Sequence, residues 1–219
     1  MKKIACAVVL TFFAVCIVCG QTKEIYIHPQ FDSIAKDHSI LAILPFDVTI
    51  NLRHKQKEKL KEGELENLQK KEGEGVQSAI QTYFLEQKTK KEFKVTFQDI
   101  SKTNALLAKN NWTTDSMKTK TREEICALLG VDGIISGTLF TDKPMSEGAS
   151  FAALFLTDGW FGGATNSGKC TINVHEAKAG ELLWKYEKTL SRSLGSDINS
   201  VINAMMRKAS KKFPYEDIK

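Results

Sequence analysis

Residues 125–140 read ICALLGVDGIISGTLF, a stretch in which a helix passes directly into a strand. Thr121 and Glu124 stand just before it with the Thr-x-x-Glu spacing of a capping box, which predicts the start of the helix. Gly130 is expected to end the helix, because glycine readily adopts the left-handed conformation found at helix ends. The residues that follow are apolar on both faces, which predicts a strand in the middle of a sheet.

Shorter apolar or alternating segments on either side predict the other strands. Residues 40–48, ILAILPFDV, are too short for a buried helix, and Pro45 indicates an edge or a bulge. Residues 93–97 alternate between apolar and polar, as a strand with one wet face does. Residues 170–174 and 182–190 alternate on either side of a glycine-containing turn, which predicts an antiparallel hairpin.

Amphipathic helices are predicted between and after these strands. Apolar residues recur at helical spacing over 76–84, a short helix is expected over 104–110, and a longer one runs from Ser196 to near Pro214. The order β-α-β-α-α-β-β-β-α predicts an α/β (α+β) fold, with a mixed sheet of about five strands and helices packed on it.

Length and composition indicate one globular domain. The 219 residues are 42% hydrophobic and 26% charged, which excludes a collagen, a disordered chain and a polytopic membrane protein. We expect a signal peptide over 1–20, an extended lead-in over 21–38 and a single domain over 39–214. Within that domain we expect a solvated, charged helical arm interrupted by glycines over 53–74, and an apolar, glycine-rich insertion over 149–164.

The amino terminus has the pattern of a secretory signal. Lys2 and Lys3 precede the uncharged residues 4–18, a run shorter than the roughly 20 residues that span a bilayer as a helix. Cleavage is expected between Gly20 and Gln21, which would leave an exported protein.

Two alternatives to a soluble exported chain stay open. One is a lipoprotein anchored through Cys16 or Cys19, although valine rather than a small residue precedes each cysteine; the other is an uncleaved membrane helix. Cleavage would lower the formal charge from +5 to +3 and leave only Cys126 and Cys170. Both lie in apolar surroundings, so we expect buried free thiols, with a disulfide as the alternative.

The motif most suggestive of chemistry is a phosphate-loop pattern. Residues 163–170 read GATNSGKC, which fits G-x-x-x-x-G-K. Cys170 stands where a hydroxyl should hold magnesium, and the residues that follow alternate as a strand rather than opening a helix. We therefore predict a glycine-rich connection and no nucleotide site.

Catalytic and metal-binding patterns are missing from the sequence. The four histidines are scattered without metal-ligand spacing. His175 and Cys170 have an odd separation on one predicted strand, so they should point to opposite faces, and a histidine at a strand end is usually exposed. Asp99 and Asp132 are expected to be turn or cap residues. We predict no catalytic, cofactor-binding or metal site, and no enzyme.

The basic residues do not indicate nucleic acid. They are mostly lysines interleaved with glutamates, and only the basic residues of 207–212 cluster. At a helix end, that cluster is expected to complement the helix dipole.

One segment suggests an interaction surface. Residues 150–164, SFAALFLTDGWFGGA, are apolar and glycine-rich. They are expected to pack against a neighbouring element or a second subunit, or else to form an exposed contact loop. The candidate contact residues are Phe151, Phe155, Leu156, Trp160 and Phe161.

Four spaced segments resemble a known family. In order, they are ILAILPFDV, KVTFQDISKTNALL, ICALLGVDGIISGTL and TINVHEAKAGELLWKYE. Their matching features are Pro45–Phe46 after the first strand, the Gly130–Asp132 turn followed by Gly137, and the Gly180–Glu181 hairpin turn. Over about residues 39–212 the chain resembles the curli-secretion lipoprotein superfamily, which includes the TolB amino-terminal domain and the penicillin-binding-protein activator lipoproteins. It is most similar to uncharacterised secreted bacterial members.

The resemblance implies a non-enzymatic α/β domain in a bacterial cell envelope. We expect it in the periplasm or associated with the outer membrane, where it would bind or assemble with other envelope proteins. The chain departs from the family in lacking a convincing lipidation motif and the long alternating strands of the curli pore. The alternatives are an envelope transport or secretion-pore subunit that contacts the outer membrane, and a nucleotide-dependent enzyme. A homo-oligomer and membrane association without a transmembrane helix stay open.

Overall fold

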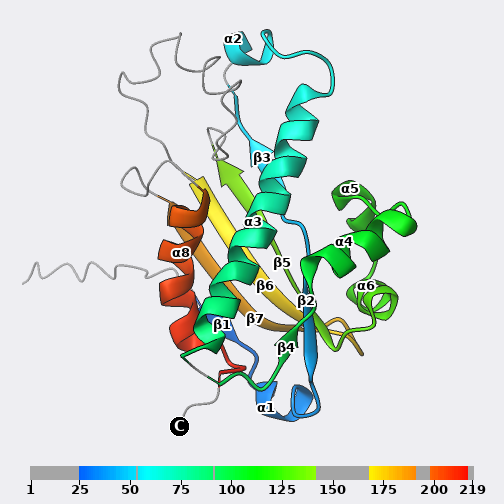
Figure 1. Cartoon of the computed structure of the whole chain (residues 1–219), viewed down its shortest axis with the longest axis vertical. Coiled ribbons are helices and arrows are strands. Elements are labelled where there is room, and N and C mark those ends of the chain that lie inside the picture. Colours follow the sequence, from blue (N-terminus) through cyan, green and yellow to red (C-terminus); the bar gives the residue numbers. More distant parts are fainter. Residues whose placement is uncertain (1–24, 53, 91, 142–167, 191–197, 217–219) are drawn as a thin grey trace, which may run out of the picture.

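The computed structural model describes residues 25–52, 54–90, 92–141, 168–190 and 198–216. They form a mixed, largely open sheet with helices packed on it (Figure 1). The predicted signal peptide and the predicted insertion at 149–164 lie outside the described residues. The predicted fold class is confirmed.

Within the described ranges the sheet has seven strands, six of them in the order β1-β7-β6-β5-β2-β4, and β3 also pairs with β5. As predicted, the strand after Gly130 is central: it pairs in parallel with β2 and β3 and antiparallel with β6. The predicted hairpin is β6–β7. The strands are β1 (Ile25–Ile27), β2 (Ile40–Ile43), β3 (Asp47–Ile50), β4 (Thr96–Phe97), β5 (Gly133–Thr141), β6 (Gly168–Glu176) and β7 (Leu182–Leu190).

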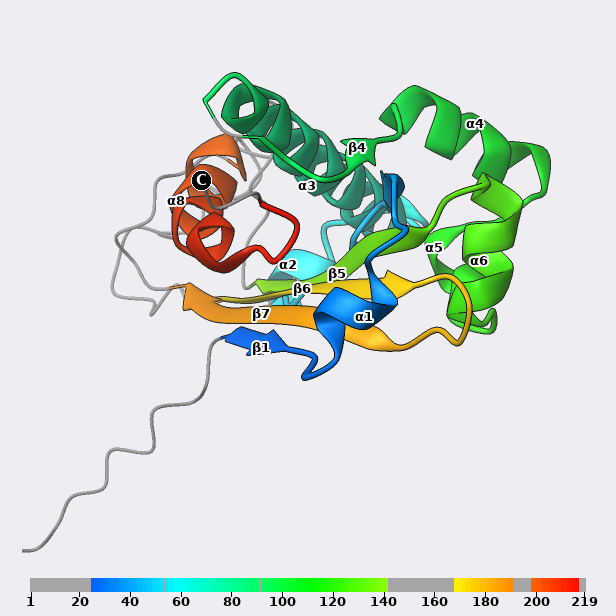
Figure 2. The ribbon, with the colours of Figure 1, turned by 90° about the horizontal axis from the view of Figure 1, so that it is seen from below.

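The helices form two groups. Figure 2 shows α3 and α8 on one side of strands β5–β7, while α4, α5 and α6 lie on the other side of β2 and β5, where they pack against Ala42, Leu44 and Ile134. The helices are α1 (Phe31–Ile34), α2 (His54–Lys57), α3 (Glu64–Lys88), α4 (Ile100–Lys109), α5 (Thr114–Met117), α6 (Arg122–Leu129) and α8 (Ile198–Ala209), with a 3-10 turn at Ser210–Lys212.

The strand predicted over 40–48 is divided at Pro45 into β2 and β3. Ile43 pairs with Ile135 and Asp47 pairs with Thr138, so this side of the ladder holds one residue more than β5 does. Proline has no N–H to donate to a ladder, which is why the extra residue falls there. The bulge predicted at Pro45 is therefore present.

Helix α3 differs from the predicted solvated arm. It runs without a break through Gly73, and Leu68, Glu72 and Gly73 in its first half are buried. This half of the helix is buried because it packs against the break between β2 and β3. The Phe46 N–H donates to the Gly73 carbonyl at 3.2 Å, and a Cβ atom on Gly73 would overlap the Phe46 carbonyl oxygen. Glycine lets the helix backbone approach the strand break, so it serves packing here and does not end the helix.

The segment predicted as an extended lead-in also contains structure. Its first described residues form β1, which pairs with β7 as Ile25↔Tyr186 and Ile27↔Trp184, and helix α1 follows. Strand β1 extends the sheet beyond β7, and α1 lies at the lower end of the molecule (Figure 1).

The start and end of α6 are as predicted. Thr121 and Glu124 make both hydrogen bonds of a capping box, and Gly130 after the helix is left-handed, with φ of 65°. Cys126 and Cys170 are free and buried, which confirms the prediction of buried free thiols over the alternative of a disulfide. They belong to different hydrophobic clusters: Cys126 packs with α4–α6, and Cys170 packs under α3 and α8.

Candidate functional site

A cleft follows the β2–β3 break, between α3 and the connection from α4 to α5. It consists of three adjoining hollows of about 390, 250 and 120 Å³, and Thr114 lines all three. We call it the Pro45 cleft. Its largest hollow is lined by Pro45, Lys70, Glu74, Asn104, Leu107, Ala108, Asn111, Trp112, Thr113, Thr114 and Met117.

The end of α4 places Trp112 at the cleft. Asn111 is left-handed, with φ of 56°, and its N–H donates to the Ala108 carbonyl, while the Trp112 N–H donates to the Leu107 carbonyl at 2.9 Å. These two bonds form a Schellman motif, in which the residue after the left-handed one packs back on the last turn of the helix. Trp112 accordingly packs, partly buried, against the cluster that contains Leu107. The Lys120 ammonium lies 5.3 Å from the centre of its ring.

Two amide side chains link the walls of the cleft to each other. Gln77 on α3 and Asn104 on α4 exchange hydrogen bonds of 2.9 and 3.0 Å, and Gln77 also donates to the Ile43 carbonyl at 2.7 Å. Gln77 is buried, so these bonds satisfy groups that would be costly to leave unpaired. They tie α3, α4 and β2 together, which holds two walls of the cleft in a fixed arrangement.

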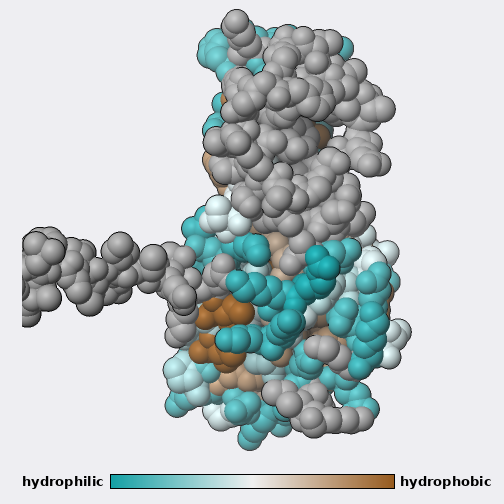
Figure 3. Space-filling view, turned by 90° about the vertical axis from the view of Figure 1, so that its left-hand side faces the viewer, coloured by the Kyte–Doolittle hydropathy of each residue, from teal (hydrophilic) through white to brown (hydrophobic). Residues whose placement is uncertain are grey.

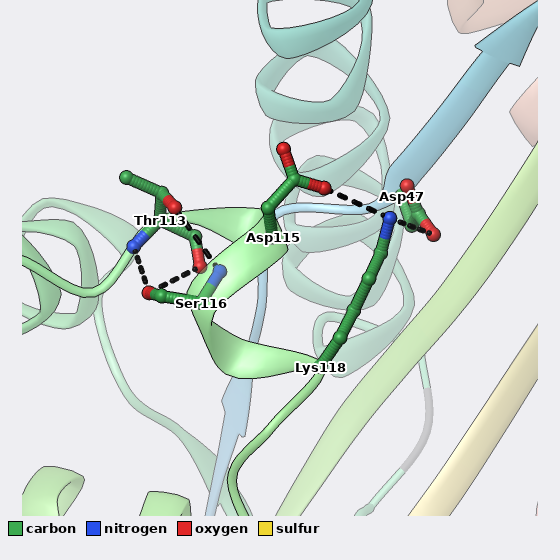
Figure 4. A network of polar contacts seen from close by, with 5 residues as sticks. All are labelled: Asp47, Thr113, Asp115, Ser116 and Lys118. Atoms are coloured by element: carbon green, nitrogen blue, oxygen red, sulfur yellow. Dashed lines mark hydrogen bonds and ion pairs between the residues drawn. The ribbon is translucent and has the colours of Figure 1, made fainter.

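The rim near α5 carries an ionic network (Figure 4). Lys118 lies 3.0 Å from both Asp115 and Asp47, so it links α5 to the first residue of β3. These contacts, with Asp115 first and Asp47 second, raise the pKa of Lys118. Thr113 and Ser116 cap α5 reciprocally. Because these groups are largely exposed, the network orients the rim more than it stabilises the fold.

The chemistry of the cleft is mixed. Pro45, Leu107 and Met117 supply apolar surface, while amides and hydroxyls supply donors and acceptors. Acidic and basic side chains occur in nearly equal number along the three hollows, so no strong field of either sign results. This combination suits a segment that carries both apolar and hydrogen-bonding groups.

A second apolar surface lies at the edge strand β1. Ile27 is 43% exposed, and Figure 3 shows brown, hydrophobic surface beside the grey amino-terminal trace. An edge strand can pair with another chain, but three residues offer little length for that. The Pro45 cleft is therefore the stronger candidate.

Asp99 and Asp132 act as structural acceptors, and neither lines the cleft. Asp99 caps α4 by accepting from the Ser101 N–H at 2.7 Å. Asp132 accepts from the Ser39 N–H, the Ser39 hydroxyl and the Ile40 N–H at 2.8 to 3.0 Å. Burial tends to raise the pKa of Asp132, but these hydrogen bonds outweigh it and the pKa is lowered.

His175 and Cys170 point away from each other, as predicted. Burial, followed by the Arg122 charge, lowers the pKa of His175 to about 4, and burial raises the pKa of Cys170 to about 12. His175 is half-buried, which corrects the expectation of an exposed histidine; α6 packs over this end of β6. Residues 168–170 open β6, so the phosphate-loop pattern leads into a strand, as predicted.

Two sets of predicted site residues lie outside the described residues. They are the interaction residues Phe151, Phe155, Leu156, Trp160 and Phe161, and the cleavage site at Gly20 and Gln21.

The Pro45 cleft was not predicted from the sequence, because its walls come from segments that are far apart in the chain. One local signal existed: asparagine is favoured at a left-handed position after a helix, and Asn111 stands directly before a tryptophan in a polar stretch.

No family model matches the chain, and no curated protein matches its sequence. Solved structures do match. Lipoprotein GNA1162 from Neisseria meningitidis is 7% identical over 80% of this chain and 99% of its own, with a TM-score of 0.42. The LpoB C-terminal domain from Salmonella enterica is 13% identical over 75% and 94%, with a TM-score of 0.35. The PelC dodecamer from Paraburkholderia phytofirmans is 12% identical over 78% and 84%, with a TM-score of 0.30.

Two features are absent from the described residues. None of their helices combines the length and the apolar character needed to cross a bilayer. Nor do the described histidines, cysteines and acidic residues gather in groups of three or more that could hold a metal ion.

Proposed function

We propose that this chain is a non-enzymatic protein of the bacterial cell envelope that binds a segment of another envelope protein in the Pro45 cleft. Export rests on the signal pattern of residues 1–20, and the envelope setting on the family resemblance of the sequence. The observation that carries the proposal is the cleft itself, a hollow of about 390 Å³ continued by a second of about 250 Å³ along the β3 edge.

The cleft has the features of a site that accepts peptide. A bound segment meets apolar surface at Pro45 and Leu107, and amide or hydroxyl partners at Asn111 and Thr114. Its walls are a long helix, a strand break and a braced helix end, so little ordering is needed on binding. Sites of this kind hold a side chain in a pocket while main-chain groups of the ligand are satisfied around it.

The chemistry of the buried groups supports binding over catalysis. Burial raises the pKa of both Cys126 and Cys170 to about 12, so both stay protonated and poorly nucleophilic at neutral pH. His175, with its pKa lowered to about 4, is neutral there, and it lies on the opposite face of the sheet from Cys170.

Photo-crosslinking in living cells tests the proposal. A photoreactive residue is placed at Thr114, which lines all three hollows, and a second is placed at Ala105, which is exposed on α4 outside the cleft. We expect an envelope protein to be captured from position 114 and not from position 105.

Blocking variants supply the matched control. Ala108→Trp fills the cleft from the exposed side of α4, whereas Ala105→Trp adds the same bulk on the same helix outside it. Ala108→Trp should abolish the crosslink from position 114 and Ala105→Trp should leave it intact. Equal capture in both blocked variants would show that the cleft is not the binding site.

A further inference from the structure

Basic side chains collect where α3 and α8 end. The two helices pack together and finish at the same end of the molecule (Figure 1). Their ends are joined by a hydrogen bond between the Tyr83 hydroxyl and the Ser210 hydroxyl at 2.7 Å, and the Lys94 N–H donates to the Tyr215 carbonyl. The exposed cations of this basic end are Lys88, Lys90, Lys94, Arg207, Lys208, Lys211 and Lys212.

The basic end has a local excess of positive charge. Among the residues of this end that the structure describes, seven are basic and three, Glu86, Glu92 and Glu216, are acidic. The sequence alone shows only the run at 207–212; the fold adds the lysines that follow α3. A surface with a net positive charge attracts negative charge over about 8 Å at physiological ionic strength.

Helix capping accounts for only part of this cluster. Basic residues in the last turn, such as Lys88 and Lys208, complement the negative end of a helix dipole. Lys90 and Lys94 lie after α3 has ended, and Lys211 and Lys212 lie after α8. The dipole effect falls off within the last turn, so it does not account for these lysines.

An exposed leucine lies beside the first of these cations, Lys88. Leu85 is 54% exposed, on the face of α3 opposite its buried residues and one turn before Lys88. An apolar side chain beside exposed lysines can enter the headgroup region of a bilayer while the lysines meet the lipid phosphates. A soluble polyanion would use the lysines and gain nothing from the leucine.

We propose that this basic end contacts the surface of a membrane rich in anionic phospholipids, with Leu85 entering the headgroup layer. Lipid phosphates are the recognised chemistry, and Lys90, Lys211 and Lys212 are the principal contacts. The Pro45 cleft takes no part in this contact, so the proposal stands independently of the proposed function.

Binding to lipid vesicles tests the proposal. The full chain is mixed with vesicles of phosphatidylglycerol and phosphatidylcholine in equal parts, or of phosphatidylcholine alone, and the bound fraction is measured by sedimentation. Lys90→Gln, Lys211→Gln and Lys212→Gln are combined in one variant. Lys57→Gln, Lys61→Gln and Lys102→Gln, also exposed but on other elements, form a control with the same net charge. The amino-terminal residues are identical in all variants, so their contribution to binding cancels.

We expect the first variant to lose about 10- to 100-fold in its partition onto anionic vesicles, since each basic residue near such a surface contributes about fivefold. The control should change by less than about threefold, and high salt should erase the difference between the two. Leu85→Ser should weaken binding about fivefold. Unchanged unfolding midpoints would show that every variant is folded.

Two results would overturn the proposal. Equal losses in the two triple variants would mean that only the net charge matters. Binding of inorganic polyphosphate together with an unaltered response of Leu85→Ser to vesicles would assign the basic end to a soluble polyanion and not to a membrane.

Discussion

The carbonyl oxygen of Phe46 lies where the Cβ atom of any larger residue at position 73 would have to lie. The ring of Phe46 lies equally close to Gly137 on β5. One residue at the strand break thus contacts both the long helix α3, through its backbone, and the central strand, through its ring, and the Pro45 cleft lies beside this junction. Glycine at these two positions is a requirement of packing.

Gly73→Ala should destabilise the protein by about 1–3 kcal/mol, because the new methyl group overlaps the Phe46 carbonyl. The direction is informative, since alanine in place of glycine in a helix otherwise stabilises by about 1 kcal/mol. Urea unfolding measures the change. The exposed neighbour serves as control, and Glu74→Ala should stay within about 0.5 kcal/mol of the parent. A more stable Gly73→Ala protein would mean that the close approach is absent.

Thr121→Ala should lower the free energy of unfolding by about 1 kcal/mol, because it removes the side chain that accepts from the Glu124 N–H at the start of α6. Thermal or urea unfolding detects a loss of this size. Thr82→Ala is the matched control: Thr82 is exposed within α3 and caps nothing, so its replacement should be neutral or slightly stabilising. Equal losses in the two variants would argue against a capping role.

Asp132→Asn should remove part of the acid sensitivity of the fold. The folded-state pKa of Asp132 is lowered, so its contribution to stability is complete above its ordinary pKa near 3.8 and is lost as the pH falls below that value. At neutral pH the variant should be about 1 kcal/mol less stable, and the difference should shrink below about pH 4. Urea unfolding at several pH values measures this; a difference that is the same at every pH would contradict the role of the charge.

His175→Gln should alter stability in a different pH range. Burial lowers the folded-state pKa of His175 to about 4 from an ordinary 6.5, so the unfolded chain binds a proton more readily than the folded one between these values. The parent protein should lose about 1 kcal/mol from this group between pH 6.5 and 4, after allowance for partial exposure. The variant should lack that component. A parallel pH dependence in parent and variant would show that His175 titrates normally in the folded state.

Elements specified by neighbouring residues could be predicted from the sequence. The capping box at Thr121, the stop at Gly130, the bulge at Pro45 and the β6–β7 hairpin each depend on a few adjacent side chains. The continuity of α3 could not be predicted, because Gly73, which would weaken an isolated helix, is here required by its contact with Phe46.

The cleft and the basic end depend on contacts between distant segments. Strand β1 has three residues and a partner at the other end of the chain, so it carries no periodic signal of its own. The cleft joins residues near 45, 70 and 112, and the basic end joins the residues after α3 to those after α8. Each local segment had an ordinary interpretation, as a charged helix, a polar turn or a capped helix end, and only the packing brings them together.

The pairing of β1 with β7 also determines when the protein can finish folding. Ile25, at the start of the described chain, pairs with Tyr186, and β2 pairs with β5 across about ninety residues. Contacts of such long range form slowly, because a large loop must close before they contribute any stability. The sheet therefore cannot be completed until residues 182–190 have been synthesised. Such a delay is compatible with the proposed export, because an exported chain stays unfolded while it crosses a membrane.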